Sequence, residues 1–202
     1  MPEYFASRLK LFVALAPVTT VRWHRVTLLK FLYIYKDDLF VLLNLFNINQ
    51  LLAYVGFAND ALRVICSYKM RNVCLRVTDS IINSATEYDD FDRMAFYQQN
   101  YPNGISLRTV KHFVQSIDTG TFAAFRQDYS AGSTDIQSID LSDIGKIAPI
   151  AFFYGEHDLV ADKKDVLALK QLVQPVITKE IKGGHATFLI GKDMTYFTHD
   201  VM

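Results

Sequence analysis

The stretch IAPIAFFY, residues 147–154, limits what this chain can fold into more than any other segment. It is an almost unbroken apolar run that stops at Gly155, which is typical of a fully buried strand. Residues 163–173 follow with apolar side chains near helical spacing, and the half-polar VITKEI, residues 176–181, fits an edge strand. A strand, a helix and a strand in this order predict the βαβ unit of a parallel sheet.

One further strand is predicted near the N-terminus. Residues 9–16, LKLFVALA, form an apolar run that Pro17 stops. Three strands in 202 residues make a small α/β sheet. Either more strands escape sequence reading or the chain is one portion of a larger domain, and we favour the second interpretation.

The middle of the chain, roughly residues 20–145, has a different pattern. It favours helices at 26–35, 39–52 and 107–117, with Ser106 as the N-cap of the last and Thr109 at the capping-box position. Long insertions between strands often act as lids or binding caps. We therefore expect an α/β core formed by residues 1–20 and 145–202, interrupted by a mostly helical lid at 21–144.

Composition and charge exclude some classes of function. Half of the residues are hydrophobic, so the chain can bury a core. Lys+Arg and Asp+Glu both number 21, and the net charge of zero argues against nucleic acid or anionic membrane as a partner.

Two apolar segments are candidates for a targeting or membrane element. The N-terminal residues lack a basic region, and Glu3, Arg8 and Lys10 break their apolar run, so we expect no signal peptide. The uncharged stretch Leu39–Asn59 is long enough to span a membrane, but four Asn and Gln residues crowd its middle. A covered amphipathic helix explains it better, and no transmembrane segment is expected.

Polar residues at the ends of two strands carry the catalytic hypothesis. Asp158 follows one strand and His185 follows the next, in the loop IKGGHATF. Functional groups gather at the carboxyl ends of parallel strands, so the two side chains can meet, and a carboxylate there would orient the imidazole. The alternative is a helix-capping role for the acidic loop, with Asp162 as the cap, and a solvent-exposed histidine.

Other ionisable groups receive structural interpretations. Glu156 and His157 are expected to be loop residues, and His24, His112 and His199 have no comparable neighbours in the sequence. The acidic cluster EYDDFD, residues 87–92, lacks calcium-loop spacing and is expected to be a solvated turn. Cys66 and Cys74 match no common zinc pattern, which leaves two free thiols or one local disulfide. We expect no metal and no cofactor.

A hydrolase also needs a nucleophile and oxyanion donors. The G-x-S-x-G motif of α/β-hydrolases is absent from the sequence. In that fold the serine precedes the acid and the histidine, so it would lie upstream of residue 9.

Four segments together resemble the acid lipases, the lysosomal and gastric-type lipases of the α/β-hydrolase superfamily. They occur in family order: FVALAPV (12–18), NYPNGISLRTVKHFVQSIDTGTFAAF (100–125), GEHDLVADKKDV (155–166) and GGHATFLIG (183–191). The first resembles the strand after the nucleophile, the second the return from the lid, and the last two the acid and histidine loops. The resemblance implies a partial α/β-hydrolase fold that corresponds to the C-terminal half of an acid lipase.

The resemblance also implies roles for individual residues. Asp158 would be the acid of the Ser-His-Asp triad, His185 the general base, and Asp162 a structural aspartate. The family's disulfide favours a Cys66–Cys74 pair and an oxidising compartment, lysosomal or extracellular. The sequence departs from the family at Ala186-Thr187-Phe188, where Leu-Asp-Phe is expected, which removes a carboxylate near the base.

Two functions follow as hypotheses. The first is the hydrolysis of neutral lipid esters by the full protein, with this chain alone inactive because it lacks the nucleophile. The second is a catalytically inactive, lipase-like remnant that binds lipid or protein. In the second case the missing strands would leave a sheet edge exposed, which invites aggregation or a partner that covers it.

Overall fold

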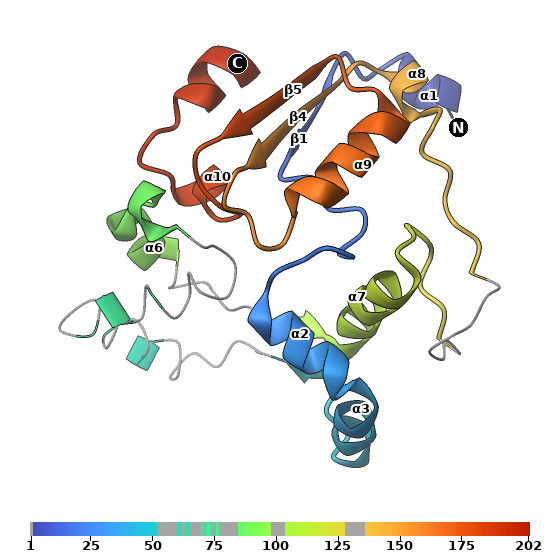
Figure 1. Cartoon of the computed structure of the whole chain (residues 1–202), viewed down its shortest axis with the longest axis vertical. Helices are drawn as coiled ribbons and strands as arrows, with labels where there is room; N and C mark the ends of the chain where they lie inside the picture. The colour runs from blue at the N-terminus through green and yellow to red at the C-terminus, as the bar shows by residue number, and fades with distance from the viewer. Residues whose placement is uncertain are drawn as a thin grey trace.

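The computed structural model describes residues 2–51, 60–61, 64, 70, 72–73, 76, 85–97, 104–127 and 136–202. Its centre is a parallel sheet of three strands in the order β1-β4-β5, where β1 is Phe12–Leu15, β4 is Ile150–Gly155 and β5 is Ile177–Ile181 (Figure 1). Every residue of β4 is buried, and Phe153 is fully enclosed. The predicted parallel sheet with a buried central strand is confirmed.

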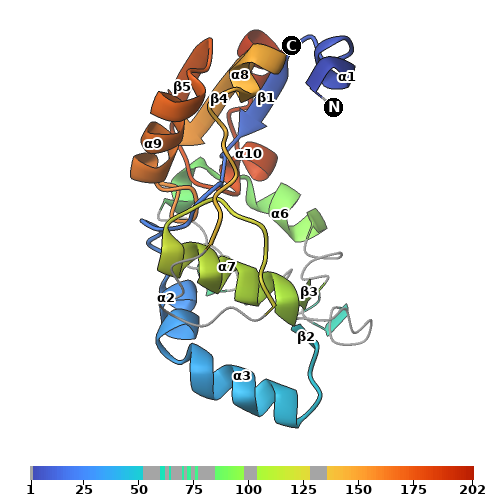
Figure 2. The ribbon, with the colours of Figure 1, turned by 90° about the vertical axis from the view of Figure 1, so that its right-hand side faces the viewer.

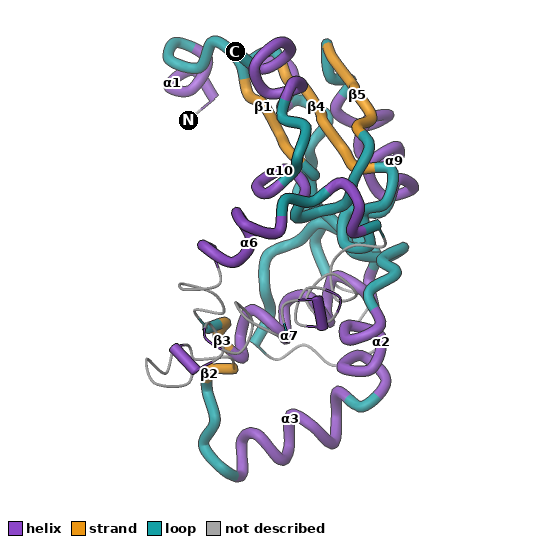
Figure 3. Tube along the Cα trace, turned by 90° about the vertical axis from the view of Figure 1, so that its left-hand side faces the viewer, coloured by secondary structure: helices purple, strands orange, loops and turns teal. Residues whose placement is uncertain are grey.

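Helix α9 (Lys163–Val173) connects β4 to β5, as the spacing of its apolar residues predicted. The Asp162 carboxylate caps it by accepting a hydrogen bond from the backbone N–H of Lys164 at 2.9 Å. Val166 and Leu169 pack into the same core as the sheet. Figures 2 and 3 show α9 on one side of the sheet and α10 (Thr187–Ile190) on the other.

The outer strands of the sheet differ in how well they were predicted. The assignment of 176–181 to an edge is confirmed, because β5 pairs with β4 alone among the described residues. The predicted strand 9–16 is too long, since pairing with β4 begins only at Phe12, opposite Ile150. Leu9 and Leu11 precede it with exposed side chains.

The remaining elements of the described residues are mostly short. They are α1 (Pro2–Ala6), α2 (Thr27–Ile34), α3 (Lys36–Leu45), β2 (Gln50–Leu51), η1 (Thr86–Tyr88), α6 (Phe91–Tyr97), β3 (Ile105–Ser106), α7 (Leu107–Thr119), α8 (Ile144–Ile147) and the C-terminal π-helical turn η2 (Phe197–Val201). In Figure 1 the three-stranded sheet lies above α2, α3 and α7. The division into a core and a lid insertion remains a prediction.

Helix α7 confirms the prediction for 107–117 and its cap. The Ser106 hydroxyl accepts a hydrogen bond from the N–H of Thr109 at 3.1 Å and lies 2.8 Å from that residue's own hydroxyl. The helix ends at Gly120, whose φ of 61° is the left-handed conformation common at helix C-termini.

The helix predicted over 39–52 is wrong at both ends. α3 begins at Lys36 and ends at Leu45, because Asn47 adopts the left-handed conformation with φ of 53° and the N–H of Ile48 returns to the carbonyl of Leu43. Gln50–Leu51 then forms a strand that pairs with β3 in antiparallel orientation. A single αL residue thus converts the apolar run from helix to strand.

The expected covering of this helix is also wrong for the described residues. Val41 and Leu45 on α3 are 69% and 76% exposed, and Leu43 is the buried residue of the helix. In the described part of the chain, no helix has the length and apolarity needed to cross a membrane. Cys66 and Cys74 lie outside the described residues, so their pairing remains a prediction.

Candidate active site

The structure brings together the two residues that the sequence proposed as acid and base. Asp158 lies in the loop after β4, and His185 lies in the loop after β5. Because these strands are parallel neighbours, their carboxyl ends meet at one rim of the sheet. The Nδ1 atom of His185 is 2.9 Å from the Oδ2 atom of Asp158. This is hydrogen-bond distance for an imidazole oriented by a carboxylate.

The surroundings of Asp158 fix the direction of that hydrogen bond. Its side chain is fully buried, whereas the side chain of His185 is 33% exposed. The Oδ1 atom accepts hydrogen bonds from the backbone N–H groups of Val160 and Ala161, each at 2.8 Å. Since Oδ1 is already held by two donors, Oδ2 is the acceptor available to the imidazole, and Nδ1 of His185 is assigned the proton that it donates. Nε2 is then the nitrogen that can exchange a proton with a reacting group.

Two glycines let the acid and histidine loops come close enough for this contact. A Cβ atom on Gly155 would stand 2.5 Å from the carbonyl oxygen of Gly183. Gly183 itself has φ of 133°, which residues with side chains rarely adopt. Its carbonyl accepts a hydrogen bond from the backbone N–H of His157 at 2.9 Å. Glycine at these two positions therefore permits the close approach of the acid and histidine loops.

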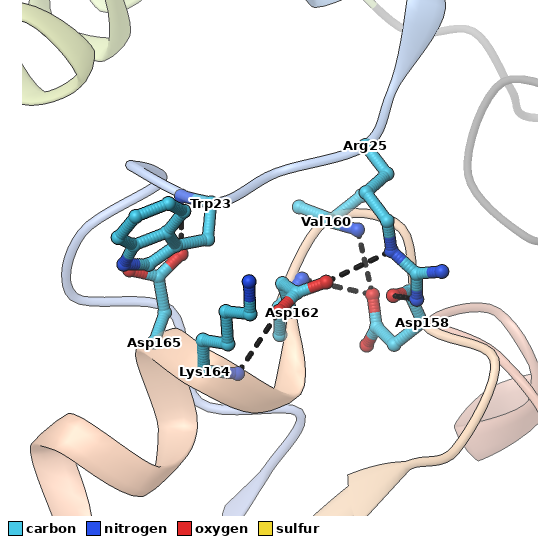
Figure 4. Close-up of polar contacts among 8 residues, drawn as sticks. Trp23, Arg25, Asp158, Val160, Asp162, Lys164 and Asp165 are labelled. Atoms are coloured by element: carbon cyan, nitrogen blue, oxygen red, sulfur yellow. Dashed lines mark hydrogen bonds and ion pairs between the residues drawn. The ribbon is translucent and has the colours of Figure 1, made fainter.

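An arginine from a distant part of the sequence holds the acid loop (Figure 4). Arg25 lies just before α2, and its Nε donates to Oδ2 of Asp162 at 2.8 Å while its Nη2 donates to the carbonyl of Asp158 at 3.1 Å. Its backbone N–H donates to the carbonyl of Leu159 at 2.8 Å. Asp162 is therefore both a helix cap and an ion-pair partner. Sequence reasoning missed Arg25, because an arginine 137 positions away from its partner leaves no local signal.

Another buried carboxylate, Asp165, lies beside this contact. Asp165 accepts hydrogen bonds from the Thr20 hydroxyl at 2.9 Å and the Trp23 backbone N–H at 3.0 Å. Burial raises the pKa of Asp165, and these hydrogen bonds oppose the rise. The neighbouring His24 is also buried, and burial together with the charge of Lys30 lowers its pKa. The segment before α2 is thus tied to α9 by polar contacts.

The acidic cluster at 87–92 is not the solvated turn that the sequence predicted. Asp89 is 1% exposed, and its Oδ1 accepts a hydrogen bond from the Thr187 hydroxyl at 2.6 Å. That hydroxyl accepts one from the backbone N–H of Gly184 at 2.8 Å. The prediction failed because burial of one aspartate in an acidic run depends on tertiary packing. The acid lipase pattern has an aspartate at the position of Thr187. Its replacement by threonine was the sequence signal that a carboxylate from another segment could lie here.

The other ionisable residues noted in the sequence lie outside the Asp158–His185 contact. Glu156 is exposed, His157 stacks against the ring of Tyr88, and Nε2 of His112 is 2.9 Å from the carbonyl of Ala123. His199 lies exposed in η2. Within the described ranges, no group of three His, Cys, Asp or Glu side chains is arranged to hold a metal ion. No serine in those ranges makes a hydrogen bond with His185.

Comparison with known proteins connects this geometry to a family. No protein-family model matches the chain. The chain is 28% identical to human gastric triacylglycerol lipase over 193 residues, which cover 87% of the chain and 45% of the lipase. It is 26% identical to mouse lipase member K, covering 95% of the chain and 49% of that protein. It is 24% identical to a putative lysosomal acid lipase/cholesteryl ester hydrolase of Crotalus adamanteus, with 96% and 49% covered.

These matches confirm the resemblance to the acid lipases that the sequence motifs indicated. The chain spans about half the length of the curated relatives it matches, which agrees with correspondence to one half of such a lipase. The mixed fold of helices and a parallel sheet agrees with the α/β class as well. At the level of the family, the relatives support lipase-type hydrolysis of esters.

Proposed function

We propose that this chain supplies the acid and the general base of a lipase that hydrolyses carboxylic ester bonds of neutral lipids. The observation that carries the proposal is the 2.9 Å contact between Asp158 and His185 at the carboxyl ends of two adjacent parallel strands. The similarity to gastric and lysosomal-type lipases supports triacylglycerols or cholesteryl esters as the substrate class. The nucleophilic serine and the oxyanion donors would come from a part of the protein outside these 202 residues.

The proposed mechanism assigns the proton transfers of both half-reactions to His185. Nε2 of its imidazole takes the proton of the nucleophilic hydroxyl as that oxygen attacks the ester carbonyl. The imidazolium is stabilised by the carboxylate of Asp158 and then gives the proton to the departing alcohol. In the second half of the reaction, Nε2 takes a proton from the water that attacks the acyl-enzyme carbonyl, and the imidazolium returns this proton to the serine oxygen as the fatty acid leaves. Asp158 is suited to its role because its other oxygen is already held by two backbone N–H groups.

The names of the acid lipase relatives also bear on the cellular location of the protein. The gastric and lysosomal names of the relatives agree with a lysosomal or extracellular location. An oxidising compartment would permit the proposed pairing of Cys66 with Cys74. Non-reducing peptide mass mapping would identify a peptide that contains both residues if the disulfide is formed.

The decisive test begins upstream of the chain. Sequencing the 5′ end of the transcript should reveal an in-frame G-x-S-x-G, and its absence would contradict the proposal. The 202-residue chain alone should not hydrolyse p-nitrophenyl esters, whereas the extended protein should. In the extended protein, His185→Ala and Asp158→Asn should each lower kcat by a factor of about 10³ or more. His199→Ala and Asp193→Asn are matched controls on exposed residues and should leave kcat unchanged.

A second function is favoured by the outer edge of β1. On the side away from β4, no strand among the described residues pairs with β1, and Phe12 is 49% exposed there. An exposed apolar edge invites a partner. The chain would then be a non-catalytic lipid-binding or protein-binding subunit. Sedimentation and unfolding measurements separate the two: a monomeric, cooperatively folded and ester-hydrolysing 202-residue chain would exclude the binding role and also the missing-nucleophile argument.

A further inference from the structure

The segment Glu87–Arg93, here called the strap, packs beside the loops that carry the candidate site. Figure 1 shows the neighbouring helix α6 close to α10, which follows His185 in the chain. On both sides of Asp89 the strap is joined to residues 190–192, which follow the histidine loop. The backbone N–H of Asp90 donates to the carbonyl of Ile190 at 2.6 Å, and the N–H of Lys192 donates to the carbonyl of Tyr88 at 2.9 Å. Asp89 itself forms a β-bridge with Gly191.

Asp89 reaches toward His185 through one hydroxyl group. Thr187 donates its single hydroxyl proton to Asp89 and so turns a lone pair toward the N–H of Gly184, the residue before His185. Asp89 and Thr187 are 1% and 2% exposed. A Cβ on Gly183 would lie 2.4 Å from the Thr187 side chain, so this side chain packs directly against the turn that precedes His185. The chain of hydrogen bonds therefore fixes the backbone beside the imidazole.

The burial of Asp89 matters for this chain of hydrogen bonds, because its side chain accepts from the Thr187 hydroxyl away from water. An unpaired carboxylate in a buried position is costly, so the group requires donors such as the Thr187 hydroxyl. A charged acceptor strengthens the hydrogen bond it receives and polarises the hydroxyl, which makes that oxygen a better acceptor for Gly184. A side chain at residue 89 without this acceptor would hold the same loop less firmly.

The strap also contacts the acid loop. The ring of Tyr88 stacks on the imidazole of His157, with centroids 5.7 Å apart and planes 13° from parallel. His157 immediately precedes Asp158, and its backbone N–H donates to the carbonyl of Gly183. Adjacent strap residues thus contact the two loops that carry the candidate acid and base.

We propose that Asp89 is a positioning residue for His185, acting through Thr187 and Gly184, while Tyr88 steadies the acid loop. This inference rests on the proposed function, because His185 is taken as the general base. It goes beyond the proposed function because a carboxylate from a separate segment sets the orientation of the base.

The test uses the ¹⁵N-labelled 202-residue chain and does not depend on ester turnover. Two signals are followed by NMR: the low-field Nδ1 proton of His185 and the hydrogen exchange of the Gly184 amide. Asp89→Ala and Thr187→Val should broaden or abolish the Nδ1 signal and speed the exchange of Gly184 by about tenfold, the effect of losing one hydrogen bond. Thr187→Ser keeps the hydroxyl and should preserve both signals, as should the exposed-site control Asp193→Asn.

The outcomes are separable from those for the proposed function. If Asp89→Ala destabilises the fold globally, the isosteric Asp89→Asn is measured in its place. Both NMR signals should then change less, because the side chain keeps its shape and an oxygen that can accept from Thr187. Retention of the Nδ1 signal and of Gly184 protection in Asp89→Ala or Asp89→Asn and in Thr187→Val would overturn the positioning role. A change in both signals together with an extended protein that lacks esterase activity would refute the proposed function and leave the positioning contact intact.

Discussion

The ion pair between Arg25 and Asp162 offers a quantitative test of how the acid loop is held. Arg25→Met removes the guanidinium but keeps an apolar stem of similar length. Asp162→Asn removes the charge, yet its amide oxygen can still cap α9 at the N–H of Lys164. Because each variant deletes one side of the same contact, the two single variants and the double variant form a double-mutant cycle.

The geometry and exposure of the ion pair set the expected coupling free energy. The Nε–Oδ2 distance is 2.8 Å, the Arg25 side chain is 50% exposed, and the Asp162 side chain is 10% exposed. Exposed ion pairs contribute about 0–1 kcal/mol, whereas hydrogen bonds to buried charged groups contribute about 1.5–3 kcal/mol. This half-exposed pair lies between the two, so we expect a coupling free energy of about 1 kcal/mol. Arg25→Met alone should cost about 2 kcal/mol, because it also loses the hydrogen bond to the Asp158 carbonyl.

Urea unfolding followed by circular dichroism measures both quantities at constant pH. Arg25→Lys is the matched control, since it keeps the charge but cannot donate to Asp162 and to the Asp158 carbonyl in the same fork geometry. It should recover less than half of the loss. A coupling free energy below about 0.3 kcal/mol, or an Arg25→Lys protein as stable as the original, would refute the role of Arg25 in holding the acid loop.

Three further changes have defined outcomes. Phe153→Ala empties a fully enclosed position in β4 and should lower the free energy of unfolding by about 3–5 kcal/mol in urea titrations, so a loss below 1 kcal/mol would mean that the core is not closed there. Gly155→Ala places a Cβ 2.5 Å from the Gly183 carbonyl and should lower the melting temperature by more than any exposed Gly-to-Ala change; an unchanged melting temperature would contradict the close approach of the loops. His24 has a folded pKa below its ordinary value of 6.5, so the unfolded chain binds more protons and stability falls as the pH drops below about 6.5. In His24→Leu, the unfolding midpoint should fall less between pH 7.5 and pH 5 than in the original protein. Parallel pH profiles of the two proteins would show that His24 does not cause the decline.

Local sequence patterns were sufficient for the elements whose stability is local or whose burial is uniform. The apolar run ending at Gly155 predicted a buried strand, and Asp162 before residues 163–173 predicted a capped helix. The βαβ order then placed Asp158 and His185 at the same rim, because neighbouring parallel strands end side by side. These features need only periodicity, capping chemistry and a topological rule.

The errors occurred where distant residues decide the outcome. The helix expected to reach residue 52 ends at Leu45, because Asn47 adopts a left-handed conformation and Gln50–Leu51 pairs with residues 105–106. The expected strand from residue 9 shortens for a similar reason, since only Phe12 onward has a partner in β4. In both cases pairing across the chain overrode local propensity.

The sequence by itself determined the parallel α/β core and the identities of the candidate acid and base. Only the tertiary structure decided how that pair is held: Arg25 reaches the acid loop from the segment before α2, and Asp89 reaches the histidine loop from the strap. Both are charged residues in polar stretches, and whether such a residue is solvated or buried depends on which donors or acceptors the fold brings to it. A pattern read along the chain does not contain that information, because the partners are about 100 or more positions apart.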